Sequence, residues 1–313
     1  MTTALPRIEV LPRDLSPYRK GNTGIDYVHR FESGRSGPHV LVNALTHGNE
    51  FCGMVAATHL LDNAVRPKVG TLTVSFANVG AYESFDLAEP FRSRQLVQNL
   101  NRIWSAAELD GTADNPELRR ARELRPAVAA ADHILDIHST SQDVVPFWVY
   151  PAFERNAEVA MAVGRPEVHL VMPGGLGSGT PLIQHGRHGD AQERGTAMVV
   201  ECGQHFLRSA SDLATRVALD FLAHFGLVEA DPERPEPGPQ RRFELLQTHV
   251  IKTPEFHFSR PVVGFEVFDK GELVYTDGAD EVRSPVDGCT IFMPSREPTV
   301  GKEAVYLTRP IRD

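Results

Sequence analysis

The segment Glu229–Gln240 (EADPERPEPGPQ) divides the chain into two parts with different hydrophobic patterns. Its four prolines exclude a continuous helix or a central strand, because proline has a fixed φ and no backbone N–H. Such a segment forms a stiff, extended spacer. We therefore expect a first domain over residues 1–228, a linker over 229–240 and a second domain over 241–313.

Short apolar runs alternate with helical patterns in the first part, which predicts an α/β fold with a mixed, largely parallel sheet flanked by helices. One helix should end before Pro67, and another should use Ser211 as its N-cap and Gly226 as its stop. The expected helices are Glu50–Val65 and Ser211–Phe225. The expected strands are His39–Leu45, Thr71–Asn78, His133–Ile137, Phe147–Tyr150, His169–Met172 and Ala197–Val200.

The second part changes to a β pattern with regularly spaced turn signals, which is typical of a small antiparallel domain. Turns are expected at Lys270-Gly271, Asp277-Gly278, Asp287-Gly288 and Val300-Gly301. The expected strands are Val262–Phe268, Leu273–Thr276, Cys289–Met293 and Ala304–Leu307.

Charge and composition exclude several classes of partner. The chain has 41 acidic and 32 basic residues, and a net charge of −9 argues against nucleic acid. No apolar stretch is long enough to span a membrane and the N-terminus lacks a signal-peptide pattern, so we expect a cytoplasmic protein. Three cysteines are too few for a disulfide framework. A homo-oligomer is compatible with the sequence, which does not give the oligomeric state.

Two polar clusters follow predicted strands, where α/β sheets bind ligands. His47 and Glu50 come after the first of these strands, and His138 follows a later one, with Asp136 beside it as a group that could orient it. Two histidines and one carboxylate predict a catalytic zinc site with one ion per chain. The alternative is a loop histidine beside a glutamate that is favoured at a helix N-terminus.

Glu201 directly follows the apolar run Met198–Val200, and a buried strand that ends in glutamate is unfavourable unless the acid is paired or functional. One interpretation is a general base for a zinc-bound water. The other is a salt bridge at the end of a strand. Cys202 could coordinate metal in principle, but ordinary packing is favoured for it.

The segment Arg92–Trp104 concentrates arginine and asparagine before an apolar pair, Ile103 and Trp104. Arginine binds carboxylates in a bidentate fork and stabilises oxyanions, so the segment suits an anionic substrate. A solvated loop with surface arginines is the alternative.

Together these motifs resemble the succinylglutamate desuccinylase/aspartoacylase family, zinc amidohydrolases related to the metallocarboxypeptidases. The resemblance covers roughly residues 38–307. The motifs that carry it occur in the family's order and with family-like spacing. They are His47-Gly48-Asn49-Glu50, Asn101-Arg102, Asp136-Ile137-His138-Ser139-Thr140 and Glu201-Cys202-Gly203.

The resemblance implies a zinc carboxypeptidase-like fold and a role for each matching residue. His47, Glu50 and His138 would hold zinc, while Glu201 would activate water and then protonate the leaving amine. Arg94, eight positions before Arg102, would polarise the scissile carbonyl. The remaining matches, which would contact the substrate, are Asn101 and Arg102 for its carboxylate and, more weakly, Tyr306.

Three segments qualify the resemblance. At the distance where aspartoacylases carry an arginine for the acyl carboxylate, this sequence has Ala191, flanked by Arg187 and Arg194. The glycine-rich segment Gly174–Gly179 predicts a mobile pocket loop. The segment Glu281–Cys289 resembles biotinyl/lipoyl-like half-barrels, without the cofactor-bearing lysine at the hairpin, and in the family such a domain restricts access to the site.

These observations predict a zinc-dependent hydrolase that cleaves the amide bond of a small, anionic N-acyl amino acid. Two alternatives stay open: a carboxypeptidase-like hydrolase of short peptides, and a zinc- or ligand-binding module without catalysis.

Overall fold

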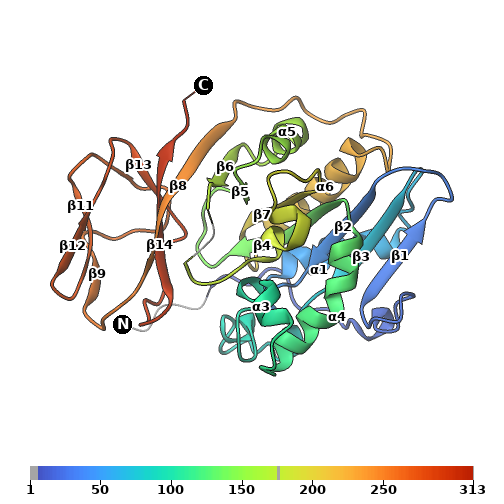
Figure 1. Cartoon of the computed structure of the whole chain (residues 1–313), viewed down its shortest axis with the longest axis horizontal. Coiled ribbons are helices and arrows are strands. Elements are labelled where there is room, and N and C mark those ends of the chain that lie inside the picture. The colour runs from blue at the N-terminus through green and yellow to red at the C-terminus, as the bar shows by residue number, and fades with distance from the viewer. Residues whose placement is uncertain (1–5, 175–176, 313) are drawn as a thin grey trace.

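The computed structural model describes residues 6–174 and 177–312. Eleven of its strands form one mixed sheet. The strand order is β1-β3-β2-β4-β7-β5-β6-β8-β14-β13-β10, and a smaller sheet has the order β12-β11-β9 (Figure 1). The strands are β1 (Val28–Glu32), β2 (His39–Ala44), β3 (Thr71–Phe76), β4 (His133–Thr140), β5 (Phe147–Pro151), β6 (Val168–Met172), β7 (Thr196–Gln204), β8 (Arg241–Val250), β9 (Phe256–Phe258), β10 (Val267–Phe268), β11 (Leu273–Asp277), β12 (Asp280–Arg283), β13 (Cys289–Phe292) and β14 (Glu303–Pro310). The helices are α1 (Phe51–Asp62), α2 (Val79–Glu83), α3 (Ala106–Leu109), α4 (Pro116–Ala130), α5 (Glu154–Val163) and α6 (Arg208–His224).

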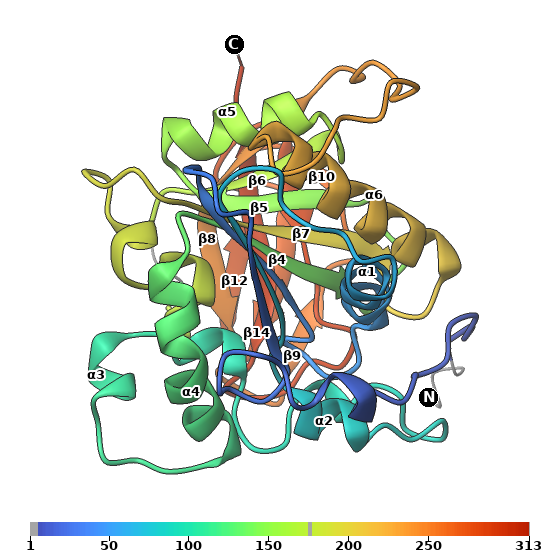
Figure 2. The same ribbon diagram turned by 90° about the vertical axis from the view of Figure 1, so that its right-hand side faces the viewer.

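Helices cover both faces of the sheet. Alternate residues of each buried strand point to opposite sides, and because both sets are apolar, both faces have to be covered. In β2, Val40 and Val42 pack in the core that contains α1 and α6, whereas Leu41 packs in the core that contains α4. Figure 2 shows α1, α5 and α6 on one side of the sheet and α4 on the other. The predicted α/β fold with a mixed, largely parallel sheet is therefore confirmed.

Strands β2, β4 and β7 are parallel neighbours, and their register determines which polar residues meet. Asn43 of β2 lies opposite Asp136 of β4, and His138 of β4 lies opposite Glu201 of β7. The carboxyl ends of the three strands consequently reach the same edge of the sheet. This edge is where the sequence predicts the functional residues.

Several predicted boundaries differ from those observed. Strand β4 continues to Thr140 and β7 to Gln204, so His138 and Glu201 lie within strands rather than after them. The prediction of Ser211 as an N-cap is wrong. Helix α6 begins at Arg208, and the Ser211 hydroxyl is buried inside it without a hydrogen-bond partner among the described residues. Gly226 ends this helix as predicted, with φ +75°.

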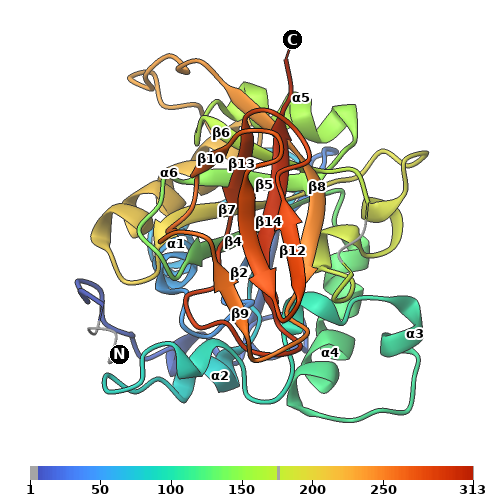
Figure 3. The same cartoon turned by 90° about the vertical axis from the view of Figure 1, so that its left-hand side faces the viewer.

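The C-terminal part extends the central sheet. Residues 229–240 form no strand or helix, and β8 then pairs in parallel with β6 and antiparallel with β14. Figure 3 shows β8, β13 and β14 side by side, with β9 and β12 near them. A separate apolar core, which includes Phe268, Tyr275 and Ile291, lies within this part. The division into two domains stays a prediction.

Among the described residues, no helix combines the length and apolar character needed to cross a membrane.

Phe292 links the two parts of the chain. It is fully buried, and its ring centroid lies 5.3 Å from that of Phe147 in β5 and 5.3 Å from that of Phe243 in β8. We expect Phe292→Ala to lower the free energy of unfolding by about 3–5 kcal/mol, because it leaves a cavity at this junction. Urea denaturation measures the change. Val267→Ala, at an exposed position, serves as the control and should shift stability by about 0.5 kcal/mol or less. An equal loss in both variants would contradict the role of Phe292.

Candidate active site

Glu50 lies at the centre of a buried cluster, between two imidazole rings. Its Oε1 is 2.8 Å from His47 Nδ1, and its Oε2 is 2.9 Å from His138 Nδ1. Potential ligand atoms of the three residues lie within 4.8 Å of one another, and all three side chains are at most 3% exposed. The structure thus brings together the three residues that the sequence predicts as metal ligands.

The hydrogen bonds around the cluster determine which nitrogen of each histidine is free. His138 Nε2 is 2.8 Å from a carboxylate oxygen of Asp136, and His47 Nε2 is 2.9 Å from the Asn99 side-chain oxygen. Asn99 Oδ1 also accepts the backbone N–H of Asn101, so it faces His47 as an acceptor. Because both partners only accept, each Nε2 carries a proton.

In the neutral tautomers, therefore, both Nδ1 lone pairs face the Glu50 carboxylate. Lone pairs and carboxylate oxygens at these distances repel each other unless a cation lies between them. Two imidazole nitrogens and one carboxylate suit a divalent metal ion, so the residues present fit such an ion. Without a metal ion, a proton takes this place on His138: although burial favours the neutral form of the ring, Asp136 and Glu50 raise its pKa well above the ordinary value. Burial, with Arg94 nearby, lowers the pKa of His47 to about 4.

Asp136 is held in place by a polar network behind the cluster. Its Oδ1 accepts hydrogen bonds from Asn43 Nδ2 and Thr46 Oγ1, both at 2.8 Å, while its Oδ2 faces His138. All of these groups are buried. A carboxylate on the far nitrogen of a histidine fixes the ring orientation and strengthens it as a ligand.

The Glu201 carboxyl lies beside this cluster without a compensating partner. Its Cα is paired with that of His138, its side chain is 5% exposed, and its Oε2 has no hydrogen bond from any described residue. Burial raises the pKa of Glu201 to about 8, although the neighbouring His138 opposes the rise. This geometry differs from a salt-bridged strand end, because no basic side chain of the described residues pairs with it.

Arg94 approaches the cluster from the 3-10 turn Arg92–Arg94, and its Nη1 is 3.3 Å from Glu50 Oε1. The loop after this turn is fixed by Glu117 of α4, whose carboxylate accepts the backbone N–H groups of Leu96, Val97 and Gln98. Gly48 is required beside it, because a Cβ there would lie 2.4 Å from the Ser93 carbonyl oxygen.

Arg102 is already paired with a carboxylate of its own chain. Its Nε and Nη2 donate to the two oxygens of Glu303 at 3.1 and 2.7 Å, and its Nη1 donates to the Asn101 carbonyl. Tyr306 donates to the same glutamate at 2.7 Å and accepts from Arg102 at 3.2 Å. Ser178 also bonds Glu303. The Asn101 side-chain oxygen, in turn, accepts the backbone N–H of Leu182.

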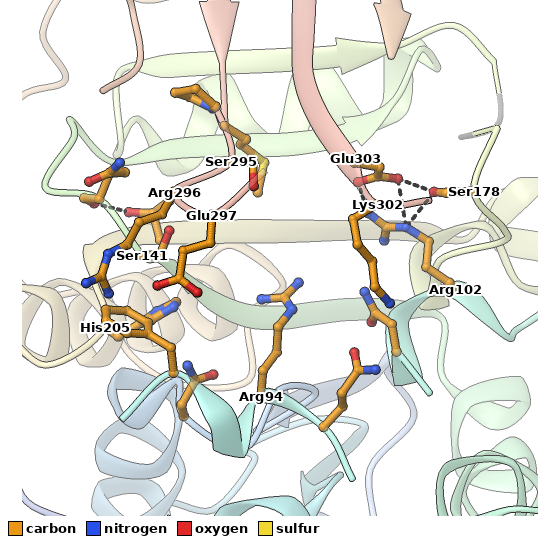
Figure 4. A pocket seen from close by; sticks show the side chains of 18 of the residues that line it. Arg94, Arg102, Ser141, Ser178, His205, Ser295, Arg296, Glu297, Lys302 and Glu303 are labelled. Carbon is orange, nitrogen blue, oxygen red and sulfur yellow. Dashed lines mark hydrogen bonds and ion pairs between the residues drawn. The ribbon is translucent and has the colours of Figure 1, made fainter. Parts of the chain in front are cut away.

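A cavity of about 650 Å³ lies beside these groups, and a smaller one of about 50 Å³ shares part of its lining. Arg94, Arg102 and Tyr306 line both cavities, whereas the three cluster residues, Glu201 and Asn101 line only the smaller one. In Figure 4, Arg94 points into the larger cavity between Arg296 on one side and Arg102 with Glu303 on the other. All eight residues predicted as site residues thus line the smaller cavity.

Other residues that the sequence singles out lie elsewhere. Neither Ala191, Arg187 nor Arg194 lines these cavities, and Arg187 bonds Asp132 and the Ala131 carbonyl instead. Cys202 is buried in the apolar core, in agreement with the packing role that the sequence favours for it. The predicted glycine-rich loop falls partly on residues 175–176, outside the described residues, but Ser178 lines the larger cavity.

Four residues of the site had no assigned role from the sequence: Asn99, His205, Arg296 and Glu303. Asn99 lies in the arginine- and asparagine-rich segment Arg92–Trp104, so the sequence does mark its position. His205 bonds Ser139 at 2.8 Å, and burial lowers its pKa to about 3. Arg296 and Glu303 lie on either side of the Val300-Gly301 turn in a β-rich region, where charged residues are ordinary, and nothing in the local pattern marks them.

Comparisons with known proteins agree with this geometry. The family model described as "Succinylglutamate desuccinylase/Aspartoacylase catalytic domain" matches residues 36–198, just over half of the chain, and ends three residues before Glu201.

Individual relatives are distant in sequence. The chain is 34% identical over 114 residues to an N-acyl-aromatic-L-amino acid amidohydrolase (carboxylate-forming) of Rattus norvegicus, a match that spans 33% of each chain. It is 22% identical over 286 residues to a succinylglutamate desuccinylase of Idiomarina loihiensis, covering 85% of this chain and 81% of the relative. The succinylglutamate desuccinylase structure of Vibrio parahaemolyticus has a similar fold, with a TM-score of 0.71, 16% identity and coverage of 92% of this chain and 87% of that one.

The role of Asp136 can be tested through metal affinity. We expect Asp136→Asn to weaken binding of Zn²⁺, used as the probe ion, by about 10- to 100-fold, because the His138 ring loses its charged partner. Competition with a chromophoric chelator measures the affinity. Asp143→Asn, an exposed position in the loop after β4, should leave the affinity unchanged. An unchanged affinity in both variants would remove Asp136 from the site.

The environment of Glu201 predicts a pH-dependent stability in the metal-free protein. With its pKa raised from 4.5 to about 8, the folded chain retains a proton that the unfolded chain releases. The contribution of Glu201 therefore makes the wild type less stable as pH rises from about 4.5 to about 8. Glutamine does not titrate, so Glu201→Gln should gain stability relative to wild type between pH 5 and pH 9. Urea unfolding at both values measures the difference, and a difference that does not change with pH would refute the raised pKa.

Proposed function

The chain belongs to the succinylglutamate desuccinylase/aspartoacylase family, and on that premise we propose that it is a zinc-dependent amidohydrolase of small N-acyl amino acids. The observation that carries the proposal is the Glu201 carboxyl, which is buried without a partner beside the His47–Glu50–His138 cluster. A buried carboxyl with a perturbed pKa next to a metal-binding cluster, at the end of an open cavity, is typical of a general acid/base.

His47, Glu50 and His138 would hold the ion through the two Nδ1 atoms and the carboxylate. Two histidines and one carboxylate form the three-ligand set of catalytic zinc sites. When bound, zinc lowers the pKa of a coordinated water and polarises a carbonyl oxygen. Asp136 and Asn99 keep the two imidazoles in the tautomer that this requires.

Glu201 would move the proton. In its ionised form the carboxylate accepts a proton from the attacking water, and the same group then returns that proton to the leaving nitrogen, so that no net proton is consumed at Glu201. Its burial keeps bulk water away from the carboxyl and, in the metal-free chain, raises its pKa, which makes the ionised group a stronger base than an exposed glutamate. The positive charge of Arg94 opposes the rise and favours the ionised form.

Arg94 would stabilise the negative charge that develops on the carbonyl oxygen. Its guanidinium projects into the cavity beside Glu50, where an oxyanion would form (Figure 4). Asn101, Arg102 and Tyr306 would position the substrate, because they line the inner cavity next to Glu201. The charge of Arg102 is balanced by Glu303, so this wall offers hydrogen bonds rather than a free cation.

The size of the cavity and the names of the relatives support the substrate class. A space of about 650 Å³ accommodates an acylated amino acid. The C-terminal part contributes Met293, Glu303 and Tyr306 to the walls, which leaves little room for a long polypeptide. The rat relative is named for N-acyl aromatic amino acids and the Idiomarina relative for succinylglutamate, both of which are N-acyl amino acids.

Glu201→Gln tests the proposal directly. We expect the variant to retain zinc and to lose about 10²- to 10⁴-fold in kcat, because glutamine cannot exchange the proton. Metal content measured by mass spectrometry, and initial rates with a panel of N-acetyl and N-succinyl amino acids, give the two readouts.

Glu255→Gln, which alters an exposed carboxylate that lines neither cavity, should leave the rates unchanged. Normal turnover by the Glu201 variant would refute the assignment of the base. Including dipeptides in the panel decides between deacylation and peptide hydrolysis, and a zinc-loaded wild type that hydrolyses nothing would refute both.

A further inference from the structure

The larger cavity is lined by five arginine and lysine side chains, of which most are already engaged. Arg102 is neutralised by Glu303, and Arg94 lies against Glu50 of the metal-binding cluster. Arg92 is 79% exposed and pairs with Glu89. Lys302 is exposed at the rim. The role that the family resemblance gives to Arg102, binding a substrate carboxylate, would therefore require Glu303 to leave first.

Arg296 differs from the other four. Its guanidinium carbon lies 4.1 Å from the centroid of the Phe91 ring, so the planar group is stacked and held. Phe91 itself packs on Phe206, at 5.7 Å between ring centroids, and on His205, at 6.0 Å. The orientation of Arg296 is thus fixed by an aromatic group that belongs to the first part of the chain.

One edge of the Arg296 guanidinium is unsatisfied. Its Nη1 is buried and has no hydrogen-bond partner among the described residues, and no carboxylate of those residues lies within 4.0 Å to form an ion pair with it. A buried guanidinium nitrogen without a partner is unfavourable by an amount comparable to a lost charged hydrogen bond. Arg296 as a whole is only half-buried and lines the larger cavity, so a ligand oxygen in that cavity can approach the rest of the guanidinium.

The position of Arg296 places it at the opposite end of the cavity from Arg102. Figure 4 shows Arg296, Glu297 and His205 on one side of Arg94, and Arg102 with Glu303 and Ser178 on the other. His205 adds no charge there, because burial keeps it neutral. A substrate whose amide lies at Arg94 can therefore extend one end towards Arg296.

We infer that Arg296, stacked on Phe91, binds a carboxylate of the substrate at the end of the cavity remote from Arg102. The planar guanidinium offers a carboxylate two parallel N–H donors, which a lysine cannot match. Arg296 would then supply the anion recognition that Ala191 cannot provide, from the C-terminal part of the chain. The inference rests on the proposed amide hydrolysis and identifies the residue that reads the charge of the substrate.

The test compares zinc-loaded wild type, Arg296→Gln and Arg296→Lys on substrates that differ by one carboxylate. One pair is the N-succinyl and N-butyryl derivatives of the same amino acid, and the other is an N-acetyl amino acid and its α-amide. We expect wild type to prefer the carboxylate in one pair. Arg296→Gln should lose about tenfold or more of that preference in kcat/KM, with the rate on the uncharged member within about twofold of wild type. Arg296→Lys should retain part of it.

Arg92→Gln is the matched control, because Arg92 lines the same cavity but is exposed and paired; its preference should equal that of wild type. Equal losses on both members of each pair would make Arg296 structural and overturn the inference, as would an intact preference in Arg296→Gln or no preference in wild type.

If wild type hydrolyses no substrate, the proposed function fails separately. Calorimetric binding of glutarate to the metal-free full chain then decides on Arg296. Weaker binding by about tenfold in Arg296→Gln, but not in Arg92→Gln, would support the site. Equal affinities, or no binding to any of the three proteins, would overturn it.

Discussion

The parallel register of β2, β4 and β7 is the constraint on which the site depends. Because parallel neighbours end at one edge, a histidine after β2, a histidine near the end of β4 and a glutamate in β7 converge from segments far apart in sequence. The register also places Asn43 opposite Asp136, so the network that orients His138 follows from the same pairing. A slip of one residue would turn these side chains to the opposite face.

Because the three strands end at the same edge, several ionisable side chains lie close together in a buried region from which water is excluded. Glu50 faces two imidazoles and Arg94, while Asp136 and Glu201 flank His138. Burial alone would raise the pKa of Glu50, yet the two histidines hold it well below its ordinary value. Glu201, which has no such partner, keeps the raised value. Two buried glutamates near the same histidine thus differ in ionisation because only Glu50 is in hydrogen-bond contact with two imidazoles, which fits Glu50 for ligation and Glu201 for proton transfer.

How much the sequence predicts depends on whether a residue lies in a periodic pattern. The apolar runs of β2, β4 and β7 predict the sheet, and the polar residues that follow them mark the site edge. The ends of β4 and β7 cannot be predicted in the same way. The apolar pattern stops at His138 and Glu201, whereas the backbone pairing between the two strands continues beyond them. Arg296 and Glu303 cannot be found in this way. Each acts through a contact with a distant segment, Phe91 in one case and Arg102 in the other, and local patterns do not encode such contacts.

The pairing of Arg102 with Glu303 changes how charge recognition in this cavity must be understood. A count of arginines along the sequence suggests a strongly cationic pocket in an acidic protein with a net charge of −9. Arg102 does not contribute a free positive charge, because its Nε and Nη2 both donate to the Glu303 carboxylate. Tyr306 and Ser178 hydrogen-bond the same carboxylate and hold it in place. What attracts an anion is then the unpaired charge rather than the total. Among the described lining residues, the cation that is both held in a fixed orientation and unpaired is Arg296, so recognition of a substrate carboxylate falls to the C-terminal part and amide cleavage to the edge of the parallel strands.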